Sequence, residues 1–285
     1  MSSVKWRIKF SNVLSEKAPS KPQGKQRMEK PVPWIGTSWK MNKVRAEARS
    51  FCSVLADSAL SHSDKVQPFV IPPFPYIAEA ASILASTNVI VGAQNMHWHE
   101  RGAWTGEVSP LMLLDCGARL VEIGHSERRA HFGETDETVA LKTAAAIRHG
   151  LIALVCVGDT LAEYQAGKTA EALERQTRML LRDVGKDSAG RVMIAYEPVW
   201  SIGEGGTPAS PEFAEFQHRR IKEVAGEAIG RAPLVLYGGS VNAVNCAALA
   251  AQENIDGLFI GRSAWDAKGF LGIIQSVLTS SEAKA

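Results

Sequence analysis

Three side chains that could take part in proton transfer stand directly after short apolar runs. Glu197 ends the stretch VMIAYE and is followed by a proline, a tryptophan and a Gly-rich segment. His125 follows ARLVEIG, and Lys40 follows WIGTSW. Carboxylate, imidazole and ammonium groups are the side chains that move protons and offset developing negative charge. The pattern indicates acid–base chemistry if the fold brings these three residues together.

The elements around these residues alternate between short apolar runs and longer helical patterns, which is typical of repeated βα units on a parallel sheet. We predict eight strands: WIGTSW from Trp34, PFVIPP from Pro68, VIVGAQ from Val89, ARLVEIG from Ala118, IALVCVG from Ile152, VMIAYE from Val192, LVLYGG from Leu234 and GLFIGR from Gly257. Helical segments are expected at residues 44–60, 76–86, from 110, and at 137–150, 160–182, 211–230, 243–251 and 268–279. The sixth of these helices has a cap candidate in Ser210.

Eight units without an internal linker favour one closed (β/α)8 barrel, a TIM barrel of class α/β, over two doubly wound halves. We therefore expect one catalytic domain over residues 33–285. In such barrels the chemistry gathers at the carboxyl ends of the strands. Lys40, His125 and Glu197 would then meet there, beside the turns that contain Ser240 and Gly261. Turns after the last two strands commonly bind phosphate through backbone N–H groups.

The first residues differ in character from the rest of the chain. Residues 1–30 carry eight Lys or Arg and two acids, which leaves 24 basic and 28 acidic residues elsewhere, a net charge of −4. We predict a basic disordered extension over residues 1–32; an organelle-targeting segment is a weaker interpretation because its pattern is diffuse. We also hypothesise that the natural chain starts at Met28, which N-terminal mass analysis would check.

Composition narrows the class of function. No apolar run reaches the roughly 20 residues of a membrane-spanning helix, and the acidic remainder does not support nucleic-acid binding. The four cysteines are widely separated and no apolar block of a secretory signal is present, which predicts a reduced, cytoplasmic location. His97 and His99 have no third ligand at a typical spacing, so we expect no metal site and no cofactor.

Six stretches, in order along the chain, resemble the triosephosphate isomerase family. They are WKMN at 39–42, AQN at 93–95, GAWTGE at 102–107, IGHSERR at 123–129, AYEPVW at 195–200 and YGGSV at 237–241. The resemblance implies that Glu197 is the base, His125 a neutral hydrogen-bond donor and Lys40 the cation of a sugar-phosphate isomerase. It also implies a lid after Glu197 that includes Gly203, and a homodimer in which Thr105 reaches the neighbouring subunit.

Three positions depart from the family pattern. Ser38 stands where the family has asparagine; Glu204, Gly205 and Gly206 stand where it has Thr-Gly-Lys; and Gly261 and Arg262 stand where it has two glycines. The smaller side chain of Ser38 leaves space beside the reacting carbons. The phosphate site is expected to include Gly203, Ser240, Gly261 and Arg262, the last through its guanidinium or only its backbone N–H.

The runs GTSWKMNK, QNMHWHERGAWTGE and DGLFIGRSAW resemble the L-erythrulose-1-phosphate isomerase branch of this family. That resemblance implies interconversion of L-erythrulose 1-phosphate and D-erythrulose 4-phosphate by enediol proton transfer in erythritol breakdown. The alternative is the glycolytic interconversion of dihydroxyacetone phosphate and D-glyceraldehyde 3-phosphate. A scaffold that has lost catalysis is a third hypothesis, against which the intact Lys40, His125 and Glu197 argue.

Overall fold

The computed structural model describes residues 30–203 and 206–282. The predicted extension over residues 1–32 lies outside this range except for residues 30–32, as do Glu204 and Gly205 of the expected lid. No helix in the described part of the chain is both long and apolar enough to cross a membrane.

Eight parallel strands form a closed barrel in chain order, which confirms the predicted fold. Each strand pairs with its sequence neighbours, and β1 closes the ring against β8. The strands are β1 (Trp34–Ser38), β2 (Gln67–Ile71), β3 (Ile90–Ala93), β4 (Leu120–Ile123), β5 (Ile152–Val157), β6 (Val192–Tyr196), β7 (Leu234–Tyr237) and β8 (Gly257–Ile260).

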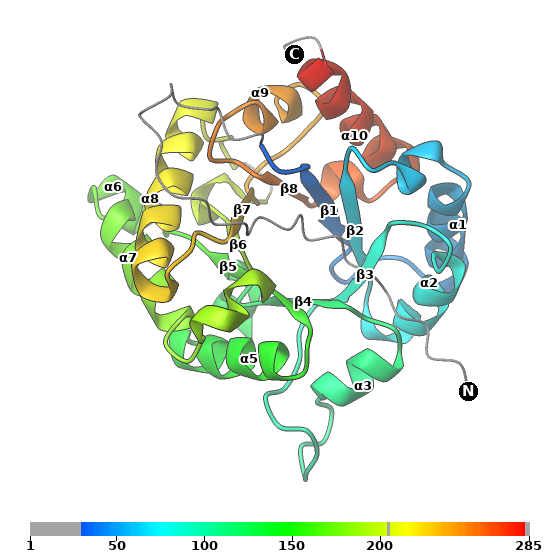
Figure 1. The fold of residues 1–285 in the computed structure, drawn as a ribbon, viewed down its shortest axis with the longest axis horizontal. Coiled ribbons are helices and arrows are strands. Elements are labelled where there is room, and N and C mark those ends of the chain that lie inside the picture. The colour runs from blue at the N-terminus through cyan, green and yellow to red at the C-terminus, as the bar shows by residue number, and fades with distance from the viewer. Residues whose placement is uncertain (1–29, 204–205, 283–285) are drawn as a thin grey trace, which may run out of the picture. The chain divides into compact units, whose positions relative to one another are not determined.

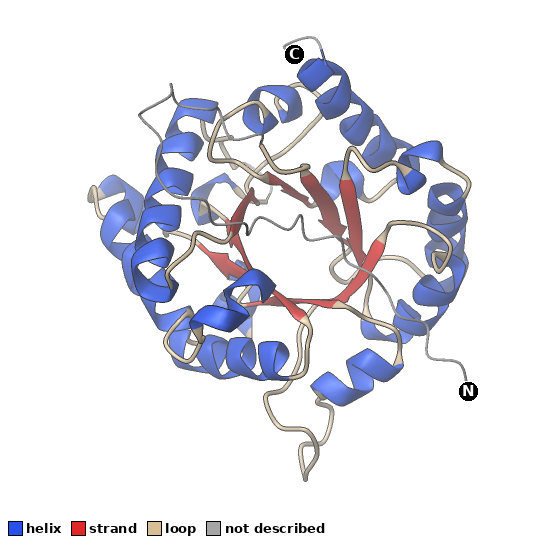
Figure 2. Ribbon diagram, viewed as in Figure 1, coloured by secondary structure: helices blue, strands red, loops and turns tan. Residues whose placement is uncertain are grey.

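Helices surround the ring of strands (Figures 1 and 2). They are α1 (Arg45–Ala56), α2 (Ile77–Ile83), α3 (Pro110–Asp115), α4 (Ser126–His131), α5 (Asp136–Arg148), α6 (Leu161–Gln165), α7 (Thr169–Leu180), α8 (Pro211–Ile229), α9 (Cys246–Ala250) and α10 (Ala267–Glu282). Short 3-10 turns lie at η1 (Ala59–His62), η2 (Phe74–Tyr76), η3 (Lys186–Arg191), η4 (Val199–Ser201) and η5 (Arg262–Ala264).

Local sequence explains where several helices begin and end. The Ser210 side chain accepts a hydrogen bond from the Phe213 N–H at 3.2 Å, so it caps α8 as expected, and Gly230 at φ 79° ends that helix. The segment 160–182, expected to be helical throughout, is two helices, because Gly167 at φ 70° breaks it. The short helix α4, directly after His125, was not expected.

Two apolar cores follow from the alternation of side chains along the strands. One lies inside the barrel and includes Phe69, Leu120, Leu154, Met193 and Phe259. The larger one lies between the strands and the surrounding helices. This double packing holds the carboxyl ends of all eight strands in fixed positions, and the loops that follow them carry the candidate site.

Candidate active site

A cavity of about 270 Å³ lies at the carboxyl ends of the strands. Residues after β1, β4, β6, β7 and β8 line it, so segments far apart in sequence meet there. The lining includes all eight residues expected at the site: Ser38, Lys40, His125, Glu197, Gly203, Ser240, Gly261 and Arg262.

Lys40 enters the cavity from a constrained loop after β1. Its φ of 53° lies in the left-handed region, which costs a residue with a Cβ roughly 1–2 kcal/mol. The Gln94 side chain donates a hydrogen bond to the Lys40 carbonyl at 2.9 Å and so holds this backbone. The Lys40 ammonium lies 2.6 Å from Oε1 of Glu127. The surrounding loops therefore fix a positive charge at the cavity wall.

The His125 ring has a defined tautomer. It stands at the start of α4, and its Nδ1 accepts a hydrogen bond from the Glu127 backbone N–H at 3.1 Å. Because Nδ1 accepts, the single ring proton of this imidazole sits on Nε2. Nε2 lies 3.3 Å from Oε1 of Glu197 and 4.0 Å from Oε1 of Glu122. His125 thus presents a neutral N–H donor among carboxyl groups.

Glu197 is only 2% exposed and follows β6 directly. The backbone N–H of Ser126 donates a hydrogen bond to its Oε2 at 3.2 Å. Two glycines leave room for it: a Cβ on Gly158 would lie 1.8 Å from the Glu197 carbonyl oxygen, and one on Gly238 would lie 2.9 Å from its Cγ. The carboxylate is therefore held between neighbouring strands and partly removed from water.

A buried carboxylate, Asp159, anchors the segment after Glu197. It accepts hydrogen bonds from the Tyr196 hydroxyl at 3.0 Å, the Trp200 indole at 3.1 Å and the Thr169 hydroxyl at 2.7 Å. Its backbone carbonyl accepts the Val199 N–H at 3.1 Å. These contacts fix the chain on both sides of the glutamate.

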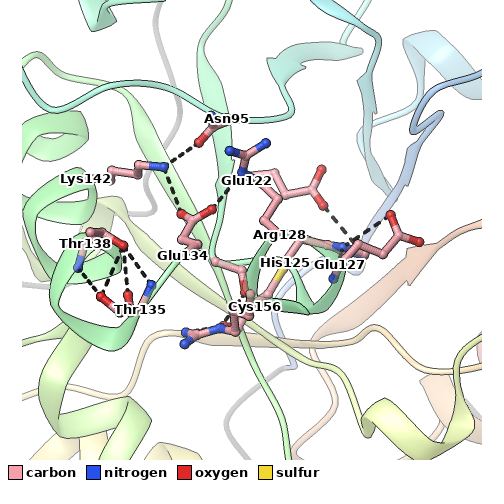
Figure 3. A network of polar contacts seen from close by, with 12 residues as sticks. Asn95, Glu122, His125, Glu127, Arg128, Glu134, Thr135, Thr138, Lys142 and Cys156 are labelled. Carbon is pink, nitrogen blue, oxygen red and sulfur yellow. Dashed lines mark hydrogen bonds and ion pairs between the residues drawn. The ribbon is translucent and has the colours of Figure 1, made fainter. Parts of the chain in front are cut away.

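Ion pairs brace the loop after β4. Glu127 pairs with Lys40, and Arg129 pairs with Asp136 at 2.6 Å. Figure 3 shows Glu122 and Glu127 each joined to the His125 ring by a dashed line.

Further along the same network, Lys142 binds Asn95 at 2.8 Å and Glu134 at 3.0 Å, and Glu134 also pairs with Arg128 at 2.7 Å (Figure 3). A network of charged side chains thus supports the loop that carries His125.

The turns after β7 and β8 form the opposite wall of the cavity. Ser201 accepts a hydrogen bond from the Ser240 backbone N–H at 3.3 Å and joins the turn to the segment after Glu197. Within the described residues the non-glycine residues with positive φ are Lys40 and Lys43, so Arg262 is unstrained. It begins the η5 turn, and no second glycine is required there.

Two further groups, Cys156 and His97, lie buried. Cys156 points into the barrel interior, where burial, with Glu197 and Glu122 nearby, raises the pKa of its thiol. That environment is typical of a packed thiol. The Nδ1 of His97 accepts a hydrogen bond from the His99 N–H at 3.0 Å, and its ring stacks on Trp98.

Comparison with known proteins places this arrangement in a family. The family model of triosephosphate isomerase matches residues 33–277. The chain belongs to the triosephosphate isomerase family. Similar curated proteins carry a narrower name, "L-erythrulose-1-phosphate isomerase". One from Mesorhizobium japonicum is 56% identical over 85% of this chain and 96% of its own length. One from Rhizobium rhizogenes is 54% identical over 85% of this chain and 93% of its own length. One from Rhizobium meliloti is 53% identical over 88% of this chain and 98% of its own length.

Three residues that support this site were not predicted from the sequence. Asp159 follows strand five in VGDT, but only the structure shows that the Tyr196 and Trp200 side chains converge on it. The Trp265 indole donates to the Ser38 carbonyl at 2.9 Å and holds the end of β1. Glu122 did leave a signal, since it is a lone charge in the apolar run LVEI.

Proposed function

We propose that the protein is an intramolecular oxidoreductase that interconverts L-erythrulose 1-phosphate and D-erythrulose 4-phosphate, a step in tetritol breakdown. The geometry that carries the proposal is the 3.3 Å approach of His125 Nε2 to Glu197 Oε1 in one cavity. Family membership supports a small phosphorylated sugar as substrate, and the names of the similar proteins support the four-carbon ketose. The reaction needs no cofactor, because it moves one proton and one carbonyl within a single molecule.

Glu197 acts as the base. Its carboxylate removes the proton from C3 of L-erythrulose 1-phosphate, and the electron pair moves to give an enediolate over C2 and C3. The same carboxyl then returns the proton to C2. Exclusion of water from a buried carboxylate strengthens it as a base.

His125 moves the hydroxyl proton. Its Nε2–H donates to O2 as negative charge develops there, and the C3 hydroxyl passes its proton back as C3 becomes the carbonyl. The C2 carbonyl is reduced, C3 is oxidised, and no proton is gained or lost overall. Lys40 offsets the charge of the enediolate, and Glu127 holds its ammonium in place.

The phosphate binds at the turns after β7 and β8. Ser240 and Gly261 provide backbone N–H groups, Gly203 covers them from the segment after β6, and Arg262 contributes its guanidinium or its backbone N–H. Ser38, buried beside the reacting groups, leaves space for the additional carbon of the tetrulose.

We further propose a homodimer in the cytoplasm. The protruding loop between β3 and α3 (Figure 1) exposes Trp104 and Thr105, and Met41 is 96% exposed, so a second copy would cover apolar surface. A monomeric mass by light scattering at micromolar concentration would contradict the dimer. The four cysteines are free, which suits a reducing compartment.

The direct test incubates the purified protein with L-erythrulose 1-phosphate in D₂O and follows the ketose phosphates by NMR. We expect D-erythrulose 4-phosphate to appear and carbon-bound deuterium to enter at the two reacting carbons. Absence of both signals, from a folded sample, would refute the proposal.

A further inference from the structure

Glu122 is a buried carboxyl group that the proposed mechanism does not use. It lies in the middle of β4, and its side chain points into the barrel toward Ser38, His125 and Glu197. The residue is 2% exposed, and its Oε2 has no hydrogen-bond partner among the described residues. A buried, unsatisfied polar atom calls for an explanation, because its desolvation costs free energy.

The surroundings keep a substantial share of the Glu122 carboxyl groups protonated near pH 7. Burial raises the pKa of Glu122 to about 7 and the Glu197 charge adds to the rise, whereas His125, the Ser38 hydroxyl and Lys40 oppose it. The nearby Cys156 stays a thiol because burial raises its pKa. A neutral carboxyl group neither competes with Glu197 as base nor repels an enediolate, and it both donates and accepts hydrogen bonds.

The packing of the barrel interior does not require a carboxyl group at position 122. Leu154, its register partner on β5, packs in the same barrel interior. An apolar side chain at position 122 would fill this interior without the cost of desolvating a carboxyl group. A polar group at this position, with one oxygen unpartnered, therefore points to a ligand.

Glu122 lies directly behind the cavity-lining residues Ser38 and His125, and the topology indicates which part of a substrate would come nearest to it. In a closed ring of eight strands, β4 lies opposite β8. Phosphate bound at Ser240, Gly261 and Arg262 directs the far end of the substrate across the cavity toward β4. In L-erythrulose 1-phosphate that far end is C4 and its hydroxyl, which dihydroxyacetone phosphate lacks.

We infer that Glu122 is a specificity-determining residue whose carboxyl group hydrogen-bonds the C4 hydroxyl of the tetrulose phosphate. This inference rests on the proposed function. The small Ser38 side chain gives the hydroxymethyl group access to the cavity floor. The terminal torsion of a glutamate is broad, so rotation of the carboxyl group turns its unpartnered oxygen toward the ligand. With the triose, the carboxyl group stays unsatisfied, and such sites discriminate strongly against analogues that lack the hydroxyl.

The test compares Glu122→Leu with the wild type. Two measurements are made: kcat/KM for L-erythrulose 1-phosphate and dihydroxyacetone phosphate, and calorimetric Kd for the unreactive L-erythritol 1-phosphate and glycerol 3-phosphate. We expect the preference for each four-carbon compound to fall at least thirtyfold, with affinity for the three-carbon compound changed less than threefold. Because the Kd ratio needs no turnover, a slow variant is still informative.

Matched variants separate specificity from packing. Leu154→Met alters the same interior without a polar group and should leave both ratios unchanged. Glu122→Gln keeps hydrogen-bonding capacity and should retain most of the preference for four-carbon compounds. Glu122→Asp withdraws the carboxyl group and should lose this preference, so it provides a second test if the leucine variant does not fold. Equal losses for three- and four-carbon compounds in the Leu and Asp variants, or no change, would overturn the inference. A wild type without four-carbon preference would instead overturn the proposed function.

Discussion

Replacing Glu122 by glutamine changes how the free energy of unfolding depends on pH. In the folded protein burial raises the pKa of this carboxyl group from 4.5 to about 7, whereas the unfolded chain titrates near the ordinary value. A difference of that size corresponds to about 3 kcal/mol. Because the pKa of Glu122 is higher in the folded state, its full contribution to the free energy of unfolding is present below about pH 4.5. That contribution is lost as the pH rises through about 7.

Glutamine occupies the same space and does not titrate. The difference in unfolding free energy, variant minus wild type, should therefore increase with pH, by roughly 2–3 kcal/mol between about pH 5 and pH 8. Contributions from all other titrating groups largely cancel in this difference.

Urea unfolding at several pH values measures this difference in unfolding free energy. Equal protein concentrations make any contribution from subunit association cancel as well. A difference that stays flat within about 0.5 kcal/mol across this range would refute the reasoning, because Glu122 would then titrate as an exposed carboxyl group does.

Substitutions at Glu197, Gly158 and Arg262 test separate parts of the site. Glu197→Asp withdraws the carboxylate by about one methylene and should lower kcat at least about 100-fold with little change in substrate affinity, as steady-state kinetics and calorimetry would show; an unchanged kcat would contradict its role as base. Gly158→Ala places a Cβ 1.8 Å from the Glu197 carbonyl oxygen, so it should cost about 1–3 kcal/mol of stability and lower activity, whereas Gly185→Ala, in open space at φ −73°, should do neither. Equal behaviour of the two alanine variants in urea unfolding would refute the packing argument. Arg262→Gly should weaken binding of the substrate phosphate about tenfold or more if the guanidinium contacts it, and an unchanged Kd would leave only the backbone N–H in that role.

The fold could be predicted from the sequence because each strand is an apolar run bounded by turn signals. A barrel buried on both sides demands such runs, and eight of them in regular alternation with helices leave few other topologies. Errors occurred where local signals compete. Gly167 breaks one expected helix into α6 and α7, and α4 is a single short segment whose start is set by His125.

The cavity-lining residues could also be predicted from the sequence, since strand ends converge at one face of a barrel. The residues that support them could not. The roles of Glu122 and Asp159 become clear only through side chains that β6 positions, Glu197 for the former and Tyr196 for the latter. One-dimensional spacing carries no information about such contacts across the barrel.

The identity of the substrate is decided by kcat/KM for L-erythrulose 1-phosphate and dihydroxyacetone phosphate, measured side by side on the purified protein. We predict a preference of at least about tenfold for the four-carbon ketose phosphate, equivalent to about 1.4 kcal/mol of transition-state stabilisation. A preference for the triose phosphate would contradict it, and the space beside Ser38 would then have no role in recognising a larger substrate.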